Sequence, residues 1–191
     1  MNINRTIFFD RFSRLSNISA ALLNIAMFNL HSELPDLRSS AYDLLVSVCL
    51  SINYNEEQLL PSAGNLTTLS IVIAYRLTNC TGGFVPGRPA VISKQISEKL
   101  SAFAPELTLD FVSQICLELE KAPGWQKAAC FQYMIPWIKN LNFFCDPTHK
   151  LYELSGARLR DCIRLLLDLT VRDHTVRNLF RPAKSSLIYS T

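Results

Sequence analysis

Residues 151–170 read LYELSGARLRDCIRLLLDLT, and this stretch decides the fold class. Its apolar side chains recur every three or four positions, the period that places them on one face of an α-helix. That face holds Leu159, Cys162, Ile163, Leu166 and Leu169. Arginine and aspartate residues occupy much of the opposite face. The stretch is therefore predicted to form a helix with one buried and one solvent-exposed side.

The same period recurs in earlier parts of the chain, separated by proline and glycine residues. It predicts helices over residues 18–30, 37–52 and 91–103, a further helix after Thr108, and one over residues 125–144. Asp36 and Thr108 are expected to cap the helices that follow them, because their side chains can accept hydrogen bonds from first-turn amides. Pro136 is expected to kink the helix that contains it.

Each predicted helix has its own apolar stripe, and these stripes are the predicted core. The list runs Ala21, Leu22, Ile25, Ala26 and Leu30; Leu37, Ala41, Leu44, Leu45, Val48 and Cys49; Val91, Ile92, Ile96, Leu100 and Phe103; Phe111, Val112, Ile115, Cys116 and Leu119; and Ala129, Cys130, Met134, Trp137, Ile138 and Leu141.

Composition limits the broad class of protein. Of 191 residues, 49% are hydrophobic and 18% charged, which is enough apolar material for a core and too little charge for a disordered chain. Only 6 glycines are present, which disfavours a turn-rich all-β fold. The net charge of +3 is too small to indicate a nucleic-acid partner.

The location in the cell is expected to be cytoplasmic, with the chain soluble or peripheral at membranes. The six cysteines are scattered, no CxxC pair occurs, and reduced core thiols are the expectation. The N-terminal residues lack the apolar core of a secretory signal. The longest apolar run, residues 66–77, is shorter than the roughly 20 residues that span a bilayer.

Successive helices that each bury one stripe must pack on their neighbours. We therefore expect an all-α, HEAT/armadillo-like α-solenoid fragment of stacked antiparallel helices. The predicted organisation is an N-terminal extension over residues 1–17, a HEAT-like domain over 18–177, and a divergent, disordered tail over 178–191.

Particular strings support this architecture by resemblance. Residues 35–45, with Pro35, Asp36, Arg38 and Ala41, resemble the second helix of a HEAT repeat. Residues 22–64, 96–114 and 127–141, which include LTLDF and YMIPWIKNL, resemble the helical repeat region of neurofibromin and its fungal relatives, the inhibitory regulators of Ras. The resemblance covers residues 20–175. It implies a large cytosolic Ras GTPase-activating protein (GAP) whose GAP and lipid-binding modules lie outside this segment.

Residues 65–81, NLTTLSIVIAYRLTNCT, depart from that family's pattern, as does the tail after Arg177. Two hypotheses fit the insert. One is a genuine extra helix or strand, and the other is a translated, retained intron, because codons for its ends can contain splice signals. The genomic sequence distinguishes them.

Candidate sites are few. Cys145 and His149 have a spacing compatible with two metal ligands, but no second pair accompanies them, so no metal site is predicted. His31 is expected to meet carbonyls at a helix end. Trp137 is predicted to be core, whereas Trp125 is a candidate interface anchor.

Basic residues crowd the C-terminal part of the chain, with Arg158, Arg160, Arg164 and Arg172 among them. They form either a solvated helix face or, with Trp125, a surface for an acidic partner or acidic lipid. No catalytic or cofactor-binding set is found.

The expected function is that of a non-catalytic scaffold segment of a neurofibromin-like Ras regulator, acting through protein–protein contact or dimerisation. Its expected partners are the remaining repeats of the parent protein or a second copy, with Ras reached only through the parent's GAP domain. The alternatives are an unrelated HEAT-type adaptor or transport scaffold and, from another class, a small helical enzyme.

Overall fold

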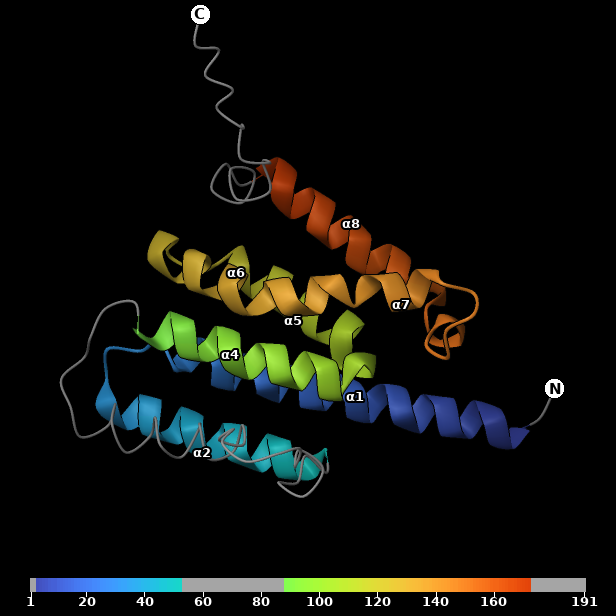
Figure 1. Ribbon diagram of the computed structural model, residues 1–191, viewed down its shortest axis with the longest axis horizontal. Helices are drawn as coiled ribbons and strands as arrows, with labels where there is room; N and C mark the ends of the chain where they lie inside the picture. Colours follow the sequence, from blue (N-terminus) through green and yellow to red (C-terminus); the bar gives the residue numbers. More distant parts are fainter. Residues whose placement is uncertain (1–2, 53–87, 173–191) are drawn as a thin grey trace, which may run out of the picture.

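The computed structural model describes residues 3–52 and 88–172, and every regular element in these two ranges is helical (Figure 1). The helices are α1 (Ile3–Asn29), α2 (Pro35–Ser51), α4 (Arg88–Phe103), α5 (Thr108–Leu119), α6 (Gly124–Lys139), α7 (Leu141–Cys145) and α8 (Gly156–Arg172), with 3₁₀ turns η2 (Pro105–Leu107) and η3 (Tyr152–Leu154). The all-α class is therefore confirmed. The predicted insert over residues 65–81 and the tail over 178–191 lie outside the described residues.

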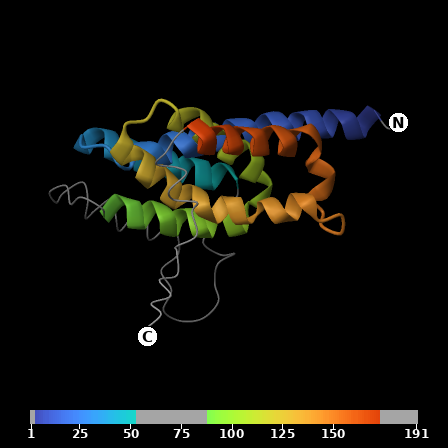
Figure 2. The same cartoon turned by 90° about the horizontal axis from the view of Figure 1, so that it is seen from above.

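The helices pack in two layers. In one layer α5 lies between α1 and α8, and in the other α4 packs along α6. Figure 2 shows α1 and α8 on one side of the molecule and α4 with α6 on the other. The two layers are joined by the packing of α5 on α6. Helix α2 packs against α1 on the opposite side of the molecule from α8 (Figure 1).

Helix boundaries differ from the sequence expectation in three places. Residues 3–17, predicted to be an extension, form the first part of α1. The helix expected over 125–144 is divided at Asn140 into α6 and α7. The stretch over 151–170 is also divided, into η3 and α8. Gly156 begins α8 with a φ of 36°, a left-handed conformation that residues with a Cβ rarely adopt.

Neither expected cap is found. Helix α2 begins at Pro35, so Asp36 lies inside the first turn, and no side chain caps the helix. Pro35 suits that first position, because the backbone N–H it lacks would have had no partner there. Thr108 is the first residue of α5, directly after the η2 turn, and makes no capping hydrogen bond. Its hydroxyl instead accepts a bond from the Asn140 amide at 3.3 Å.

The predicted core is confirmed on α5, where all five stripe residues are buried. On α1 the prediction holds for Ala26 and Leu30, which are buried, and is wrong for two other residues. Leu22 and Ile25 are exposed, and the buried stripe runs one position out of phase through Ala20, Leu23 and Met27. Both stripes are apolar at helical spacing, so the sequence period could not choose between them. Packing against α2 and α5 decides the choice.

Three further residues predicted to be core lie at the surface. They are Leu37 at 40%, Val91 at 57% and Ile163 at 38% exposure. Leu37 and Val91 lie near the first turns of α2 and α4. Ile163 lies on the side of α8 that faces away from α5, and it belongs to the surface described below.

Candidate interaction surface

The basic residues of α8 fall into two groups with different surroundings. The first group is committed to contacts inside the molecule. Arg158 forms an ion pair with Asp110 of α5 at 2.5 Å, and the Ser16 hydroxyl of α1 donates to the same carboxylate. Asp110 thereby joins α1, α5 and α8. Arg172, at the end of α8, forms an exposed ion pair with Glu120 of α5 at 3.0 Å.

The second group is Arg160 and Arg164, which are both exposed. Neither is paired with a carboxylate in residues 3–52 and 88–172. They are four positions apart, so their side chains are neighbours along one face of α8. The predicted surface of five residues is therefore not one patch. Two of its arginines tie α8 to α5, two face solvent, and Trp125 lies in α6 with a side chain outside the described set.

Three aliphatic side chains lie beside Arg160 and Arg164. Ile163, Leu167 and Val171 recur every four positions and are 38%, 59% and 68% exposed. We call these three residues the α8 ridge. The opposite side of the helix is buried against α5 through Cys162 and Leu169. Sequence reasoning assigned Ile163 to the core and missed the ridge, because α8 is apolar over more of its circumference than one neighbour can cover.

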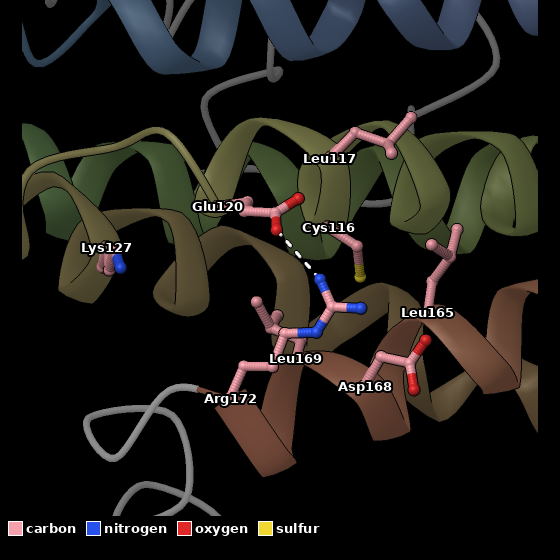
Figure 3. Close-up of a pocket in the computed structure, with 8 residues that line it drawn as sticks. All are labelled: Cys116, Leu117, Glu120, Lys127, Leu165, Asp168, Leu169 and Arg172. Atoms are coloured by element: carbon pink, nitrogen blue, oxygen red, sulfur yellow. Dashed lines mark hydrogen bonds and ion pairs between the residues drawn. The ribbon is translucent and has the colours of Figure 1, made fainter.

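A small pocket lies where α5, α8 and the start of α6 meet (Figure 3). Its volume is about 210 Å³, and the Glu120–Arg172 ion pair lies across its edge. Lys127 and Asp168 add one charge of each sign to its lining, which also includes Cys116. Because side chains of both charges line it, the pocket has no clear preference for an anion or a cation.

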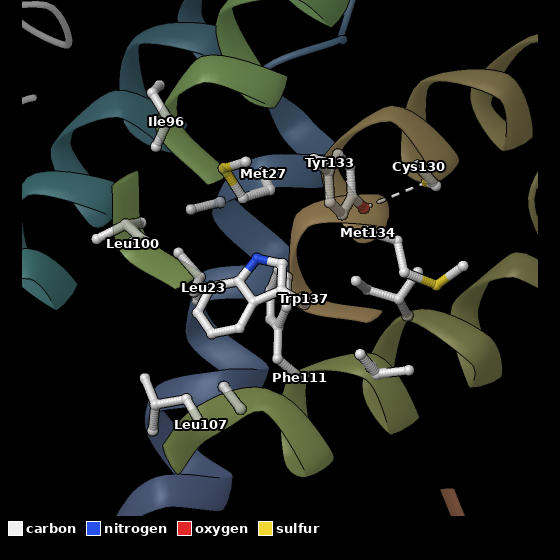
Figure 4. Close-up of a cluster of buried hydrophobic side chains, with 14 of the residues drawn as sticks. Leu23, Met27, Ile96, Leu100, Leu107, Phe111, Cys130, Tyr133, Met134 and Trp137 are labelled. Atoms are coloured by element: carbon white, nitrogen blue, oxygen red, sulfur yellow. Dashed lines mark hydrogen bonds between the residues drawn. The ribbon is translucent and has the colours of Figure 1, made fainter. Parts of the chain in front are cut away.

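The polar groups buried between the layers form a connected set, shown in part in Figure 4. Trp137 donates its indole N–H to the Ser97 hydroxyl at 2.5 Å, and Ser97 donates to the Tyr133 carbonyl. Pro136 lies inside the same helix, and because it has no N–H the carbonyl four residues earlier lacks its helical donor. Ser97 of α4 therefore connects α4 to the backbone of α6. The prediction that Trp137 is core is confirmed, with its ring 4.7 Å from that of Phe111.

The Tyr133 hydroxyl extends this set to α1. It donates to the Asn24 side chain at 3.2 Å and lies 3.2 Å from the Cys130 sulfur. The Tyr133 ring also stacks beside His31, whose Nδ1 lies 3.1 Å from the Met27 carbonyl and whose Nε2 lies 3.2 Å from the Ser93 hydroxyl. Contact of His31 with a carbonyl at the end of α1 is as expected. Burial lowers the pKa of His31, which favours the neutral ring.

The buried thiols are poorly suited to chemistry. Burial raises the pKa of Cys49 and Cys116 to about 12 and that of Cys130 to about 11, and it also raises the pKa of Cys162. The thiolate is the reactive form, so these cysteines are held as unreactive core side chains. Cys80 lies outside the described residues.

Cys145 and His149, the pair with metal-like spacing, lie around α7. Cys145 is exposed, and the His149 ring stacks on Phe143 with centroids 4.6 Å apart. Within residues 3–52 and 88–172 no group of three potential ligands is close enough to hold a metal ion. None of the helices in these ranges is long and apolar enough to span a bilayer.

Comparison with known protein families gives no matching family model for this chain.

Proposed function

We propose that this chain is a non-catalytic helical scaffold segment of a neurofibromin-like Ras GTPase-activating protein, and that it acts by presenting helix faces to protein partners. The α8 ridge is the observation that carries the scaffold role. A monomer would be expected to bury three large aliphatic side chains that lie together, whereas a scaffold leaves such a face for a neighbour.

The packing pattern supports a HEAT/armadillo-like solenoid as the architecture. Helix α4 packs on α6 and α5 packs on α8, so helices two or more positions apart in the chain are neighbours within a layer. In a solenoid each such layer extends by adding the next helix beside the last one. Helix α8 is the last described helix of its layer, and its ridge faces away from α5.

The buried polar groups support a structural role over a catalytic one. Tyr133, Ser97 and Asn24 bond to one another or to backbone, and the buried thiols carry raised pKa values. In a neurofibromin-like parent, Ras would be contacted only by the GAP domain, and this segment would position that domain in the cytoplasm or at the membrane surface. A second copy of the segment and the remaining repeats are the protein partners this role implies.

Two measurements test the proposal. Purified chain added to Ras–GTP is expected to leave the rate of phosphate release unchanged, with an isolated GAP domain as the positive control. Acceleration by this chain alone would contradict the non-catalytic role. The DNA of the same gene is expected to encode a GAP domain in frame. A gene that encodes none would remove the Ras-regulator part and favour an unrelated HEAT-type adaptor.

A further inference from the structure

The outer face of α8 combines exposed aliphatic side chains with exposed arginines. The ridge of Ile163, Leu167 and Val171 extends over nine residues, and its first and last members are about 12 Å apart along the helix axis. Arg160 and Arg164 lie along one edge of it, and the positions of a regular helix put both arginines on the same side of Leu167. The face therefore has an apolar centre and two exposed arginines along one edge.

The two edge arginines differ from their neighbours in the same helix. Arg158 and Arg172 are neutralised by Asp110 and Glu120 of α5. Arg160 and Arg164 point away from α5, and no carboxylate within the described ranges pairs with either. Their charges are thus available to a molecule that covers the ridge.

We propose that the outer face of α8 binds an amphipathic helix of a partner protein, one whose apolar stripe covers Ile163, Leu167 and Val171 and whose acidic residues line the edge facing Arg160 and Arg164. This inference rests on the proposed scaffold function and specifies the partner's chemistry. A helix fits because its own i, i+4 spacing matches that of the ridge and of the two arginines.

The surrounding residues favour a helix over an anionic membrane. Asp161 and Asp168 are also exposed on α8, three and four positions from Arg164, where they would repel lipid phosphates. The ridge also contains no aromatic side chain, whereas helices that lie in membrane interfaces commonly insert one. A partner helix can place its acidic side chains opposite the arginines and leave the aspartates in solvent.

Two synthetic helical peptides provide the probe. Both carry leucines at i, i+3, i+4 and i+7 spacing, and one has glutamates along an edge where the other has lysines. Binding to the full chain is measured by fluorescence anisotropy in low and high salt. We expect the glutamate peptide to bind with a dissociation constant on the order of micromolar, as small interfaces do, and at least about tenfold more tightly than the lysine peptide.

Variants at exposed positions locate the site without disturbing the core. Leu167→Glu is expected to raise the dissociation constant of the glutamate peptide by about tenfold or more, because the variant places a charge in the centre of the contact. Leu50→Glu is the matched control, since Leu50 is 53% exposed on α2, and it should leave binding unchanged. Charge reversal of Arg160 and Arg164 to glutamate should invert the preference toward the lysine peptide. The double Lys94→Glu, Lys99→Glu variant on α4 is its control.

The results separate this proposal from its rivals. Equal binding of the two peptides, or binding that Leu167→Glu does not weaken, would overturn it. So would sedimentation velocity showing a dimer that Leu167→Glu dissociates, because the occupant would then be a second copy. Cosedimentation with phosphatidylserine vesicles that the arginine reversal abolishes would assign the face to membranes. Failure of peptide binding, with phosphate release from Ras still unchanged, would remove this inference and leave the proposed function standing.

Discussion

The hydrogen bond from Tyr133 to Asn24 joins residues 109 positions apart and connects α6 to α1 in the interior. Tyr133→Phe removes only the hydroxyl and keeps the ring that contacts Phe111 and His31. The change leaves the Asn24 side-chain oxygen, which is in a 3% exposed residue, without this donor. A buried acceptor that loses its partner costs about 1–3 kcal/mol, so we expect the free energy of unfolding to fall by about 2 kcal/mol.

Urea unfolding followed by far-UV circular dichroism measures the loss. The denaturant slope of a chain of this size is about 2 kcal/mol per molar urea, so the midpoint should move down by about 1 M. Tyr152→Phe is the control, because Tyr152 is 44% exposed, and its midpoint should stay close to that of the unchanged protein. A cooperative transition in the unchanged protein is the condition for this comparison.

A double-mutant cycle tests the reasoning more strictly. Asn24→Leu alone should also destabilise, because it removes the partner of the Tyr133 hydroxyl. The double variant leaves neither group unpaired, so its loss should be smaller than the sum of the two single losses by about 1 kcal/mol. Strictly additive losses, or a Tyr133→Phe midpoint equal to that of Tyr152→Phe, would refute the claim that this bond connects α1 to α6.

Three other predictions concern charge and reactivity. Burial lowers the pKa of His31 in the folded protein below its ordinary 6.5, so the unfolded chain binds the extra proton first as the pH falls. The free energy of unfolding should therefore decrease below about pH 6.5, by at most about 1.4 kcal/mol per pH unit. Urea midpoints measured between pH 7.5 and 5 should lack this contribution in His31→Gln, and the same pH dependence in that variant would contradict the prediction. Arg158→Ala should lower the free energy of unfolding by about 1–3 kcal/mol, because its partner Asp110 is only 14% exposed, whereas Arg172→Ala, which removes an exposed ion pair, should lower it by less than about 1 kcal/mol. Thermal melts that rank the two variants in the opposite order would show that the Asp110 contact does not stabilise α8. Iodoacetamide at pH 8 should label the exposed Cys145 within minutes but label Cys49 and Cys116 only in denaturant, because these two buried thiols have pKa values of about 12. Peptide mass mapping measures the labelling, and rapid labelling of Cys116 in the folded protein would mean that α5 and α8 separate readily.

Much of the secondary structure could be predicted because helix period and proline positions are local properties. The predicted helices over 37–52 and 91–103 correspond to α2 and α4, with ends that differ by a few residues. The α5 stripe from Phe111 to Leu119 is predicted without error, because α5 is surrounded by α1, α6 and α8 and its apolar face has polar neighbours on both edges.

The candidate surface was predicted only in part. The cluster of arginines in α8 is evident from the sequence, but which of them face solvent is not. Asp110, the partner of Arg158, lies 48 positions earlier, and no local pattern indicates that pairing. The exposure of the α8 ridge could not be predicted for a related reason. An apolar residue such as Ile163 gives the same sequence pattern whether or not a neighbouring helix covers it.

The sequence by itself determined the helical class and the approximate extents of α2, α4 and α5, because hydrophobic period, proline and glycine act within a few residues. The tertiary structure alone decided which face of each helix is buried. On α1 it selected Ala20, Leu23 and Met27 over Leu22 and Ile25, and on α8 it left Ile163, Leu167 and Val171 in solvent. Burial depends on which helices become neighbours, and that is settled by the packing of segments far apart in the chain.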